Sequence, residues 1–221
     1  MRKSCSIIII LLLIGFGTGF AAGAQDKSDS YKEHELKAAF IYNFLKFIDW
    51  PEDASADEKT AEKSEPDQEK IIRLGVIGND EACSALEVIN GKQIKEKKIK
   101  VVYLSEKDVQ DKEPKSLKSC QVLFFCTAHK DESGKSPSPS YDLKKILALI
   151  KDSSILTIGE IPGFLEQSGM INFIVEEKKI SFEINLDTLE QAKLKARAQL
   201  LKLAKRVIRK EKKEPEQKRD N

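Results

Sequence analysis

Short apolar runs alternate with helix-like segments through the middle of the chain, and this alternation constrains the fold more than any other feature. Four runs have the length of buried strands: "IIRLGVIG" at 71–78, "KIKVVYLS" at 98–105, "QVLFFCT" at 121–127 and "SILTIGE" at 154–160. Helical patterns follow two of them, at 81–89 and 142–150. Strands that are joined through helices pair in parallel and are covered by helices on both faces. We therefore expect an α/β domain with a mainly parallel sheet.

The last part of the chain shows a different pattern. The runs "GMINFIVEE" at 169–177 and "KKISFEIN" at 178–185 are almost contiguous, which predicts an antiparallel hairpin turning at 177–178. Apolar residues then recur at three- and four-residue steps, which predicts one long amphipathic helix capped by Asn185 or Asp187. We expect this helix to pack on the core, with partner contact as the alternative. The predicted fold is α/β: a single domain with a mixed, mostly parallel sheet and helices on both faces, in which a C-terminal antiparallel hairpin precedes a long helix.

An aromatic segment, "KAAFIYNFLKFIDWPE" at 37–52, is apolar on nearly every side when it is drawn as a helix. One side carries Phe40, Phe44 and Phe47, and the opposite side carries Ala38, Ile41, Leu45 and Ile48. A helix that is apolar nearly all round must be covered on both sides. We expect the phenylalanine ridge to lie in the core, with burial by a second subunit or a partner as the alternative. The positions of Tyr42 and Trp50 stay open.

The chain begins with a segment that is typical of a secretory signal. A positively charged start, an apolar run at 7–20 and a small-residue cleavage motif at 22–24 predict a signal peptide over 1–24 that is removed on export, with a transmembrane anchor as the alternative. We expect a flexible N-terminus at 25–32 and one domain at 33–209. Segments without large apolar residues cannot offset their ordering entropy. We therefore expect a disordered insertion at 52–70 and a charged disordered tail at 210–221.

Removing the signal peptide makes the charges balance. Two of the 38 basic residues lie in 1–24, where there is no acidic residue, so 36 basic residues remain beside 36 acidic ones. A chain without net charge has no general field that would attract nucleic acid. We expect no nucleic-acid partner.

Motifs for chemistry are sparse in this sequence. The two histidines, His34 and His129, stand in no metal-ligand spacing, and there is neither H-E-x-x-H nor C-x-x-C. The loop at 162–170 is not G-x-S-x-G. We therefore expect no catalytic residue, no metal site and no cofactor. A catalytic set of Ser, His and Asp residues that lie far apart in the sequence leaves no motif. An unrecognised enzyme therefore stays an alternative.

Three separated stretches resemble the YfiR-like family of exported bacterial proteins, of the YfiR/HmsC type. They are the aromatic segment at 37–52, then "LGVIGND" with "GKQIKEKKIKVVYL" and "SCQVLFFC", and then the stretch that begins "ILTIGEIPGFLEQSGMINFIVEEKKISFEIN". Together they cover nearly all of the chain after the signal, apart from the insertion at 52–70. The motifs also occur in the order that the family shows.

The resemblance implies a periplasmic regulator and not an enzyme. Its best understood relatives bind the periplasmic sensor domain of an inner-membrane diguanylate cyclase and repress it, which controls cyclic-di-GMP and biofilm formation. The resemblance also implies a possible homodimer, and an outer-membrane lipoprotein that can remove the inhibitor. The alternative function is a periplasmic small-ligand binder that acts as a sensor component, with a pocket lined by residues such as Tyr42, Trp50 or Phe164.

Three cysteines remain after the signal: Cys83, Cys120 and Cys126. An oxidising compartment favours pairing, and the resemblance implies a disulfide between Cys83 and Cys120. Cys126 is then left over as a small apolar residue in its strand. In a regular strand it would point to the same face as Cys120, so it can also compete for Cys83.

The loop "EIPGFLEQSGM" at 160–170 is the best candidate for a recognition surface, because exposed apolar loops usually mark a contact. We expect a partner to bind Phe164, Leu165, Glu166 and Met170, together with Trp50 and Tyr42. The alternative is that Phe164 and Leu165 only fill the end of the sheet.

Overall fold

The computed structural model describes residues 22–51, 70–78, 81–110, 114–126, 141–177 and 179–209. The expected signal peptide, apart from its last three residues, therefore lies outside the described residues. So do the charged tail, almost all of the insertion at 52–70, and His129. Among the described residues, no helix is both long and apolar enough to cross a bilayer.

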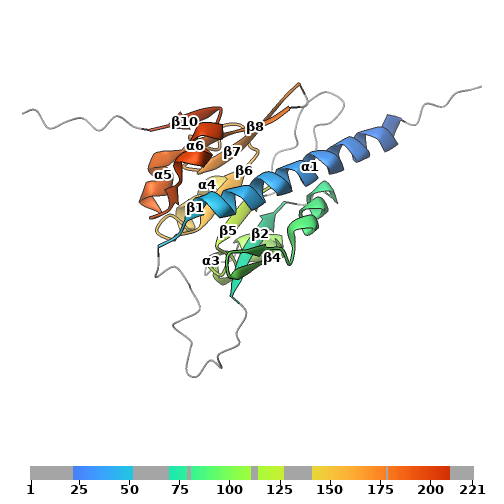
Figure 1. The fold of residues 1–221 in the computed structure, drawn as a ribbon. Coiled ribbons are helices and arrows are strands. Elements are labelled where there is room, and N and C mark those ends of the chain that lie inside the picture. The colour runs from blue at the N-terminus through green and yellow to red at the C-terminus, as the bar shows by residue number, and fades with distance from the viewer. Residues whose placement is uncertain are drawn as a thin grey trace, which may run out of the picture.

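An eight-stranded sheet forms the centre of the domain (Figure 1). Its order is β10-β8-β7-β6-β5-β2-β4-β3, with bounds β2 Ile71–Ile77, β3 Gln93–Ile94, β4 Lys97–Leu104, β5 Val122–Phe125, β6 Leu156–Gly159, β7 Ile171–Glu176, β8 Lys179–Asn185 and β10 Arg206–Ile208. Strands β4, β2, β5, β6 and β7 are parallel neighbours. β7 and β8 form the expected hairpin, in which Glu176 lies opposite Lys179. The prediction of a mixed, mostly parallel sheet is confirmed.

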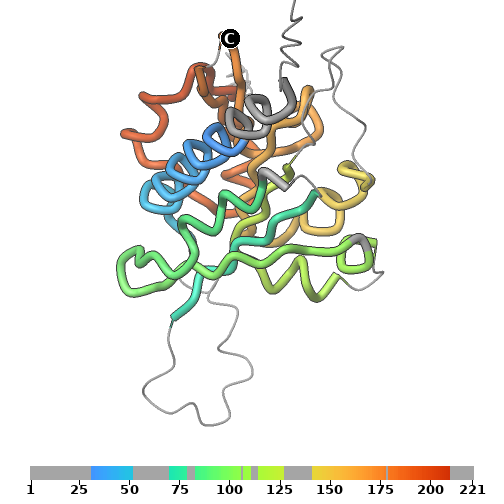
Figure 2. The backbone as a smooth tube through the Cα atoms, turned by 90° about the vertical axis from the view of Figure 1, so that its right-hand side faces the viewer, coloured from blue at the N-terminus to red at the C-terminus, as the bar shows by residue number. Residues whose placement is uncertain are grey.

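Helices cover both faces of this sheet, as expected. One face carries α1 (Ala22–Phe47) and the 3₁₀ helix η3 (Glu81–Ile89), and Figure 2 shows α1 lying along that side. The other face carries α2 (Glu106–Gln110), α3 (Lys115–Lys118) and α4 (Leu143–Leu149), which pack around Leu123 and Phe125. The two faces are separate apolar clusters because side chains alternate along each strand.

The phenylalanine ridge of α1 faces the sheet. Phe44 is fully buried, and its ring centroid lies 4.8 Å from that of Phe182 and 5.7 Å from that of Phe173. Phe40 and Phe47 are partly buried and pack against the same cluster. The core interpretation of the ridge is therefore confirmed.

The prediction of one long C-terminal helix is wrong. The chain instead forms α5 (Leu186–Gln191), β9 (Lys195–Ala196), α6 (Ala198–Leu203) and β10 (Arg206–Ile208). Asn185 caps α5 as expected, because its side chain accepts a hydrogen bond from the Thr188 N–H at 3.1 Å.

A Schellman motif ends α5. Lys193 has a left-handed backbone (φ 59°), its N–H bonds the carbonyl of Glu190, and the N–H of Leu194 bonds the carbonyl of Leu189. Glycine is the usual residue at this position, so the lysine gave no stop signal in the sequence. Pairing of β9 with β1 (Ile48–Asp49) and of β10 with β8 then overrides the helical pattern.

The expected disulfide is also wrong, because the structure joins Cys83 to Cys126 and leaves Cys120 as a buried free thiol. Strand β5 includes neither Cys120 nor Cys126, so regular alternation does not link them. Cys120 lies in the cluster beneath α3, where its thiol contacts the Ser116 carbonyl at 3.4 Å. Cys126 lies in the cluster beneath α1. The sheet therefore separates the two sulfurs.

We expect Cys83→Ser to lower the free energy of unfolding by about 4 kcal/mol, because the lost bridge closes a loop with a sequence separation of 43. Cys120→Ser is the matched control and should cost much less. Urea unfolding of the two variants and peptide mapping without reductant measure this. A mapped Cys83–Cys120 bridge would contradict the assignment.

Candidate functional site

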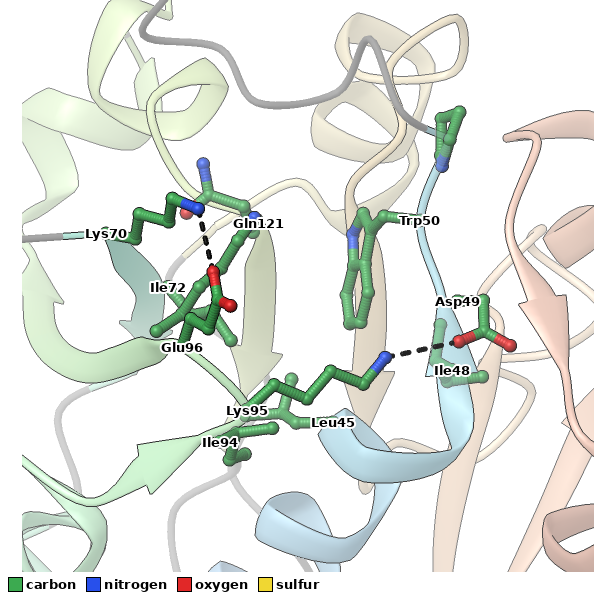
Figure 3. A pocket seen from close by; sticks show the side chains of 12 residues that line it. Leu45, Ile48, Asp49, Trp50, Lys70, Ile72, Ile94, Lys95, Glu96 and Gln121 are labelled. Carbon is green, nitrogen blue, oxygen red and sulfur yellow. Dashed lines mark hydrogen bonds and ion pairs between the residues drawn. The ribbon is translucent and has the colours of Figure 1, made fainter.

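A cavity of about 390 Å³ opens where α1 ends, beside Trp50 (Figure 3). It is formed by the end of α1, the start of β2, the turn from β3 to β4, and the residue before β5. Its lining residues are Leu45, Ile48, Asp49, Trp50, Pro51, Lys70, Ile72, Ile94, Lys95, Glu96, Lys97 and Gln121. The cavity therefore lies at the amino-terminal edge of the parallel strands.

Pairing of β1 with β9 directs the chain toward this cavity after α1 ends. The Arg197 N–H bonds the Phe47 carbonyl at 2.9 Å, and the Arg197 guanidinium holds both carboxylate oxygens of Asp49, at 2.7 and 2.9 Å. The hydrogen bond from Arg197 holds the pKa of Asp49 below its ordinary value. Asp49 stays ionised and also pairs with Lys95 across the rim, at 3.5 Å.

Trp50 forms one wall of the cavity, and in Figure 3 its indole stands across from Lys70, Ile72 and Gln121. The ring packs against the core beneath α1. Its Nε1 is buried and has no hydrogen-bond partner among the described residues. A buried N–H without an acceptor is costly, so a ligand that supplies one would gain affinity here.

Tyr42 contacts β3 but does not line the cavity. Its hydroxyl donates to the Gln93 carbonyl at 3.1 Å, and the Lys46 ammonium stands 4.3 Å from the ring centroid. Both Tyr42 and Trp50 are partly buried. The structure thus brings Tyr42 and Trp50 close to the short edge strand β3, which Tyr42 contacts at Gln93 and which supplies Ile94 to the cavity.

The other four expected site residues lie elsewhere. Phe164, Leu165 and Met170 are only 0, 2 and 5% exposed, so the expected exposed apolar loop is wrong and the alternative, that they fill the end of the sheet, is supported. A Cβ added at Gly159 would stand 2.8 Å from the Phe164 ring, and one at Gly169 would clash with it. The Phe164 ring fits because both neighbours are glycines. Glu166 is exposed, and its Oε1 lies 3.7 Å from Nη2 of Arg206.

A second polar cluster lies at the opposite, carboxyl edge of the strands, and the sequence analysis missed it. Lys37 pairs with Glu160 Oε2 and with Glu33 Oε1, the latter at 2.5 Å. His34 Nε2 lies 3.6 Å from Glu160 Oε1 and 3.5 Å from Cys126 Sγ. The side chains of His34, Lys37 and Glu160 are 3, 3 and 6% exposed. The sequence feature that could have revealed this cluster is the position of His34 and Lys37 on the same helix face as the apolar Ala38.

The buried pair is ionised in the folded chain. Burial acts to raise the pKa of Glu160, but the hydrogen bond from His34 and the charge of Lys37 outweigh it and hold that pKa below its ordinary value. Burial acts to lower the pKa of Lys37, but Glu160 and Glu33 together raise it. Tyr141 stays neutral, because burial and the Glu160 charge raise the pKa of its phenol. The Tyr141 hydroxyl is buried without a hydrogen-bond partner among the described residues.

We expect Glu160→Gln to lower the free energy of unfolding by about 3 kcal/mol, because it leaves the buried Lys37 charge with Glu33 alone. A Glu160→Gln/Lys37→Met double variant removes both charges and should recover most of that loss. Urea unfolding at pH 7 measures both. A double variant as unstable as the single one would contradict the buried-charge argument.

The same pair sets a pH dependence. The pKa of Glu160 is lower in the folded than in the unfolded chain. The contribution of Glu160 to the free energy of unfolding is therefore complete when the pH is above its unfolded-state pKa, and is lost as the pH falls through its folded-state pKa. The wild-type chain should therefore lose more stability between pH 7 and about pH 3 than the double variant does.

Comparisons with known proteins place the chain in a family. No curated protein matches it. A solved structure described as a conserved domain protein from Vibrio cholerae O1 biovar eltor str. N16961 is similar over 62% of this chain and 54% of its own, with 14% sequence identity and a TM-score of 0.43. The chain thus spans about half the length of that protein. The family model described as YfiR/HmsC-like matches residues 34–205, which is most of the chain. The chain belongs to the YfiR/HmsC-like family, a family of non-catalytic periplasmic regulators.

Proposed function

We propose that this protein is a periplasmic repressor that binds the periplasmic sensor domain of an inner-membrane signalling protein, a diguanylate cyclase. The observation that carries the proposal is the family match over residues 34–205. Export through the signal peptide at 1–24, homodimer formation and release by an outer-membrane lipoprotein belong to the same proposal. Repression of this kind requires a contact surface and no nucleophile.

The surface around Tyr42 and Trp50 is the proposed contact. Aromatic side chains are enriched at the centres of protein interfaces, and these two lie half-buried near β3, which among the described residues pairs with a strand on one side only. Lys46 and Lys92 stand 4.3 and 5.7 Å from the Tyr42 ring centroid and give this surface a basic border. The proposed partner therefore presents an apolar patch with an acidic rim.

We expect the immobilised chain to retain a GGDEF-type cyclase from solubilised membranes of the source bacterium, and to slow cyclic-di-GMP synthesis by that cyclase once purified. Trp50→Ala combined with Tyr42→Ala should weaken retention at least about 10-fold, as loss of interface anchors does. Mass spectrometry identifies the retained sensor, and product formation measures repression.

Tyr103→Ala is the matched control, because Tyr103 is 46% exposed and lies near the far end of β4 from the cavity. It should retain the cyclase as the unchanged chain does. If only Tyr103→Ala weakens retention, the contact lies at the end of β4 that carries Tyr103. A cyclase that is neither retained nor slowed would contradict the repressor function.

Small-ligand sensing is the second candidate function, and the cavity beside Trp50 favours it. A volume of about 390 Å³ suits a small metabolite, and Ile48, Ile72 and Ile94 supply an apolar lining. The buried Trp50 Nε1–H requires an acceptor. The expected ligand therefore has a compact apolar body and one acceptor group, such as a carboxylate or carbonyl.

Trp50 is the only tryptophan of the chain, so its fluorescence reports this cavity directly. We expect a hit from a metabolite thermal-shift screen to raise the melting temperature and change the Trp50 emission in one saturable step. Ile72→Phe, which fills the cavity, should abolish both changes, whereas Tyr141→Phe at the opposite edge should keep them. A hit that stabilises the chain without changing the emission binds elsewhere and would contradict this site.

A further inference from the structure

Three soft or borderline metal ligands converge in the core at the carboxyl edge of the sheet. One ring nitrogen of His34, Cys83 Sγ and Cys126 Sγ all lie within 4.8 Å of one another, and all three residues are buried. They come from α1, η3 and the residue after β5, so the fold and not a local motif brings them together. In the structure the two sulfurs are joined as a disulfide.

We propose that, once this disulfide is reduced, Cys83, Cys126, His34 and Glu160 form a binding site for a divalent ion of the Zn²⁺ class. The two thiolates and the imidazole are the ligands that zinc prefers, and a carboxylate is a common fourth ligand. This site lies at the opposite edge of the sheet from the Trp50 cavity and is independent of the proposed function.

The distances fit tetrahedral coordination. With Zn–N and Zn–O of about 2.0 Å and Zn–S of about 2.3 Å, ligand atoms in a tetrahedron stand about 3.5 Å apart for an N and S pair and about 3.3 Å for an N and O pair. In the structure His34 Nε2 is 3.5 Å from Cys126 Sγ and 3.6 Å from Glu160 Oε1. Both distances are measured from His34 Nε2, and they are close to the separations that two ligands of one ion would have.

Glu160 is already oriented for this role. Its Oε2 is held by Lys37, and its Oε1 is directed toward His34. A metal ion would take Oε1 without breaking the contact with Lys37. Lys37 then acts as a positioning residue that fixes the carboxylate from outside the coordination shell.

The charges of the reduced cluster also favour a cation. Two thiolates and the Glu160 carboxylate carry three negative charges, and Lys37 supplies one positive charge. Glu33, which also pairs with Lys37, adds a fourth negative charge. A divalent ion therefore reduces the net negative charge of the cluster from three to one.

The chemistry balances with a dithiol as the reductant. The Cys83–Cys126 bond gains two electrons and two protons and becomes two thiols, while the dithiol loses the same and closes to its own disulfide. The metal ion then displaces the two thiol protons and takes both sulfurs as thiolates. The Cα atoms of the two cysteines are 6.7 Å apart, so the freed sulfurs can separate by side-chain rotation.

The purified chain is reduced anaerobically with a trialkylphosphine, which becomes its oxide with the oxygen of one water, and is titrated with Co²⁺. We expect visible bands of tetrahedral Co²⁺ and thiolate-to-metal charge-transfer bands that saturate at one ion per chain and disappear when Zn²⁺ is added. The oxidised chain should show neither. His34→Ala and Glu160→Gln should each weaken Co²⁺ binding about 10-fold or more.

Cys120→Ser is the matched control, since it removes the third described cysteine from the opposite face of the sheet. Its bands should equal those of the unchanged chain, and a Cys83→Ser/Cys126→Ser double variant should lose the charge-transfer bands. Bands that persist in this double variant, or that disappear in Cys120→Ser, would overturn the proposal. If reduction unfolds the chain, Zn²⁺ should restore its native circular dichroism. Failure of a reduced chain to bind Co²⁺ or to refold with Zn²⁺ would also overturn it.

Discussion

Packing of α1 across one face of the sheet is the interaction on which the rest of the structure depends. Phe44 contacts the rings of Phe173 and Phe182 on the hairpin, and Ile41 and Leu45 on the same helix are also buried. Burying each of these large side chains stabilises the fold by about 1.5–3 kcal/mol. The same helix places His34 and Lys37 at the carboxyl edge of the sheet and leads to Trp50 at the amino edge. Both candidate sites therefore depend on where α1 lies.

The exposed side chains of Lys32, Glu35, Asn43 and Lys46 set the rotation of α1, but they do not fix its register along the sheet. The buried ion pair between Lys37 and Glu160 supplies that information, since only one placement of α1 matches the two charges. Buried ion pairs add little net stability compared with an apolar core, but they disfavour every arrangement that separates them. We infer that this pair specifies the register of α1, while the phenylalanine ridge supplies most of the stabilisation.

The sequence predicted the parts of the fold that depend on local pattern. Buried strands such as β2 and β5 are short apolar runs, and the hairpin of β7 and β8 follows from two runs with almost no gap. Prediction failed where tertiary contacts override the pattern. A lysine at a position that usually takes glycine ended α5, and a bend before β5 put Cys120 on the opposite face from Cys126.

The candidate sites were predicted to different extents for the same reason. Tyr42 and Trp50 lie in one aromatic segment and were recognisable together, although their position beside β3 required the fold. The cluster of His34, Lys37 and Glu160 joins residues more than 120 positions apart, as the Lys37 and Glu160 pair shows. No spacing rule brings such residues together. A charged residue on an otherwise apolar helix face indicates only that a partner exists, and not which residue it is.

The two proposed functions share one surface, and this makes them compatible. The cavity and the proposed partner contact both include Trp50, so a ligand in the cavity would change the wall that the partner touches. A ligand shifts an equilibrium only by its difference in affinity between two states. If the complex narrows or fills the cavity, ligand and partner compete, and the ligand relieves repression. If the complex leaves the cavity open and the partner also contacts the ligand, the ligand strengthens repression. The ligand then raises the affinity for the partner by the same factor by which the partner raises the affinity for the ligand. Trp50 is therefore the residue through which a small molecule would control a protein contact.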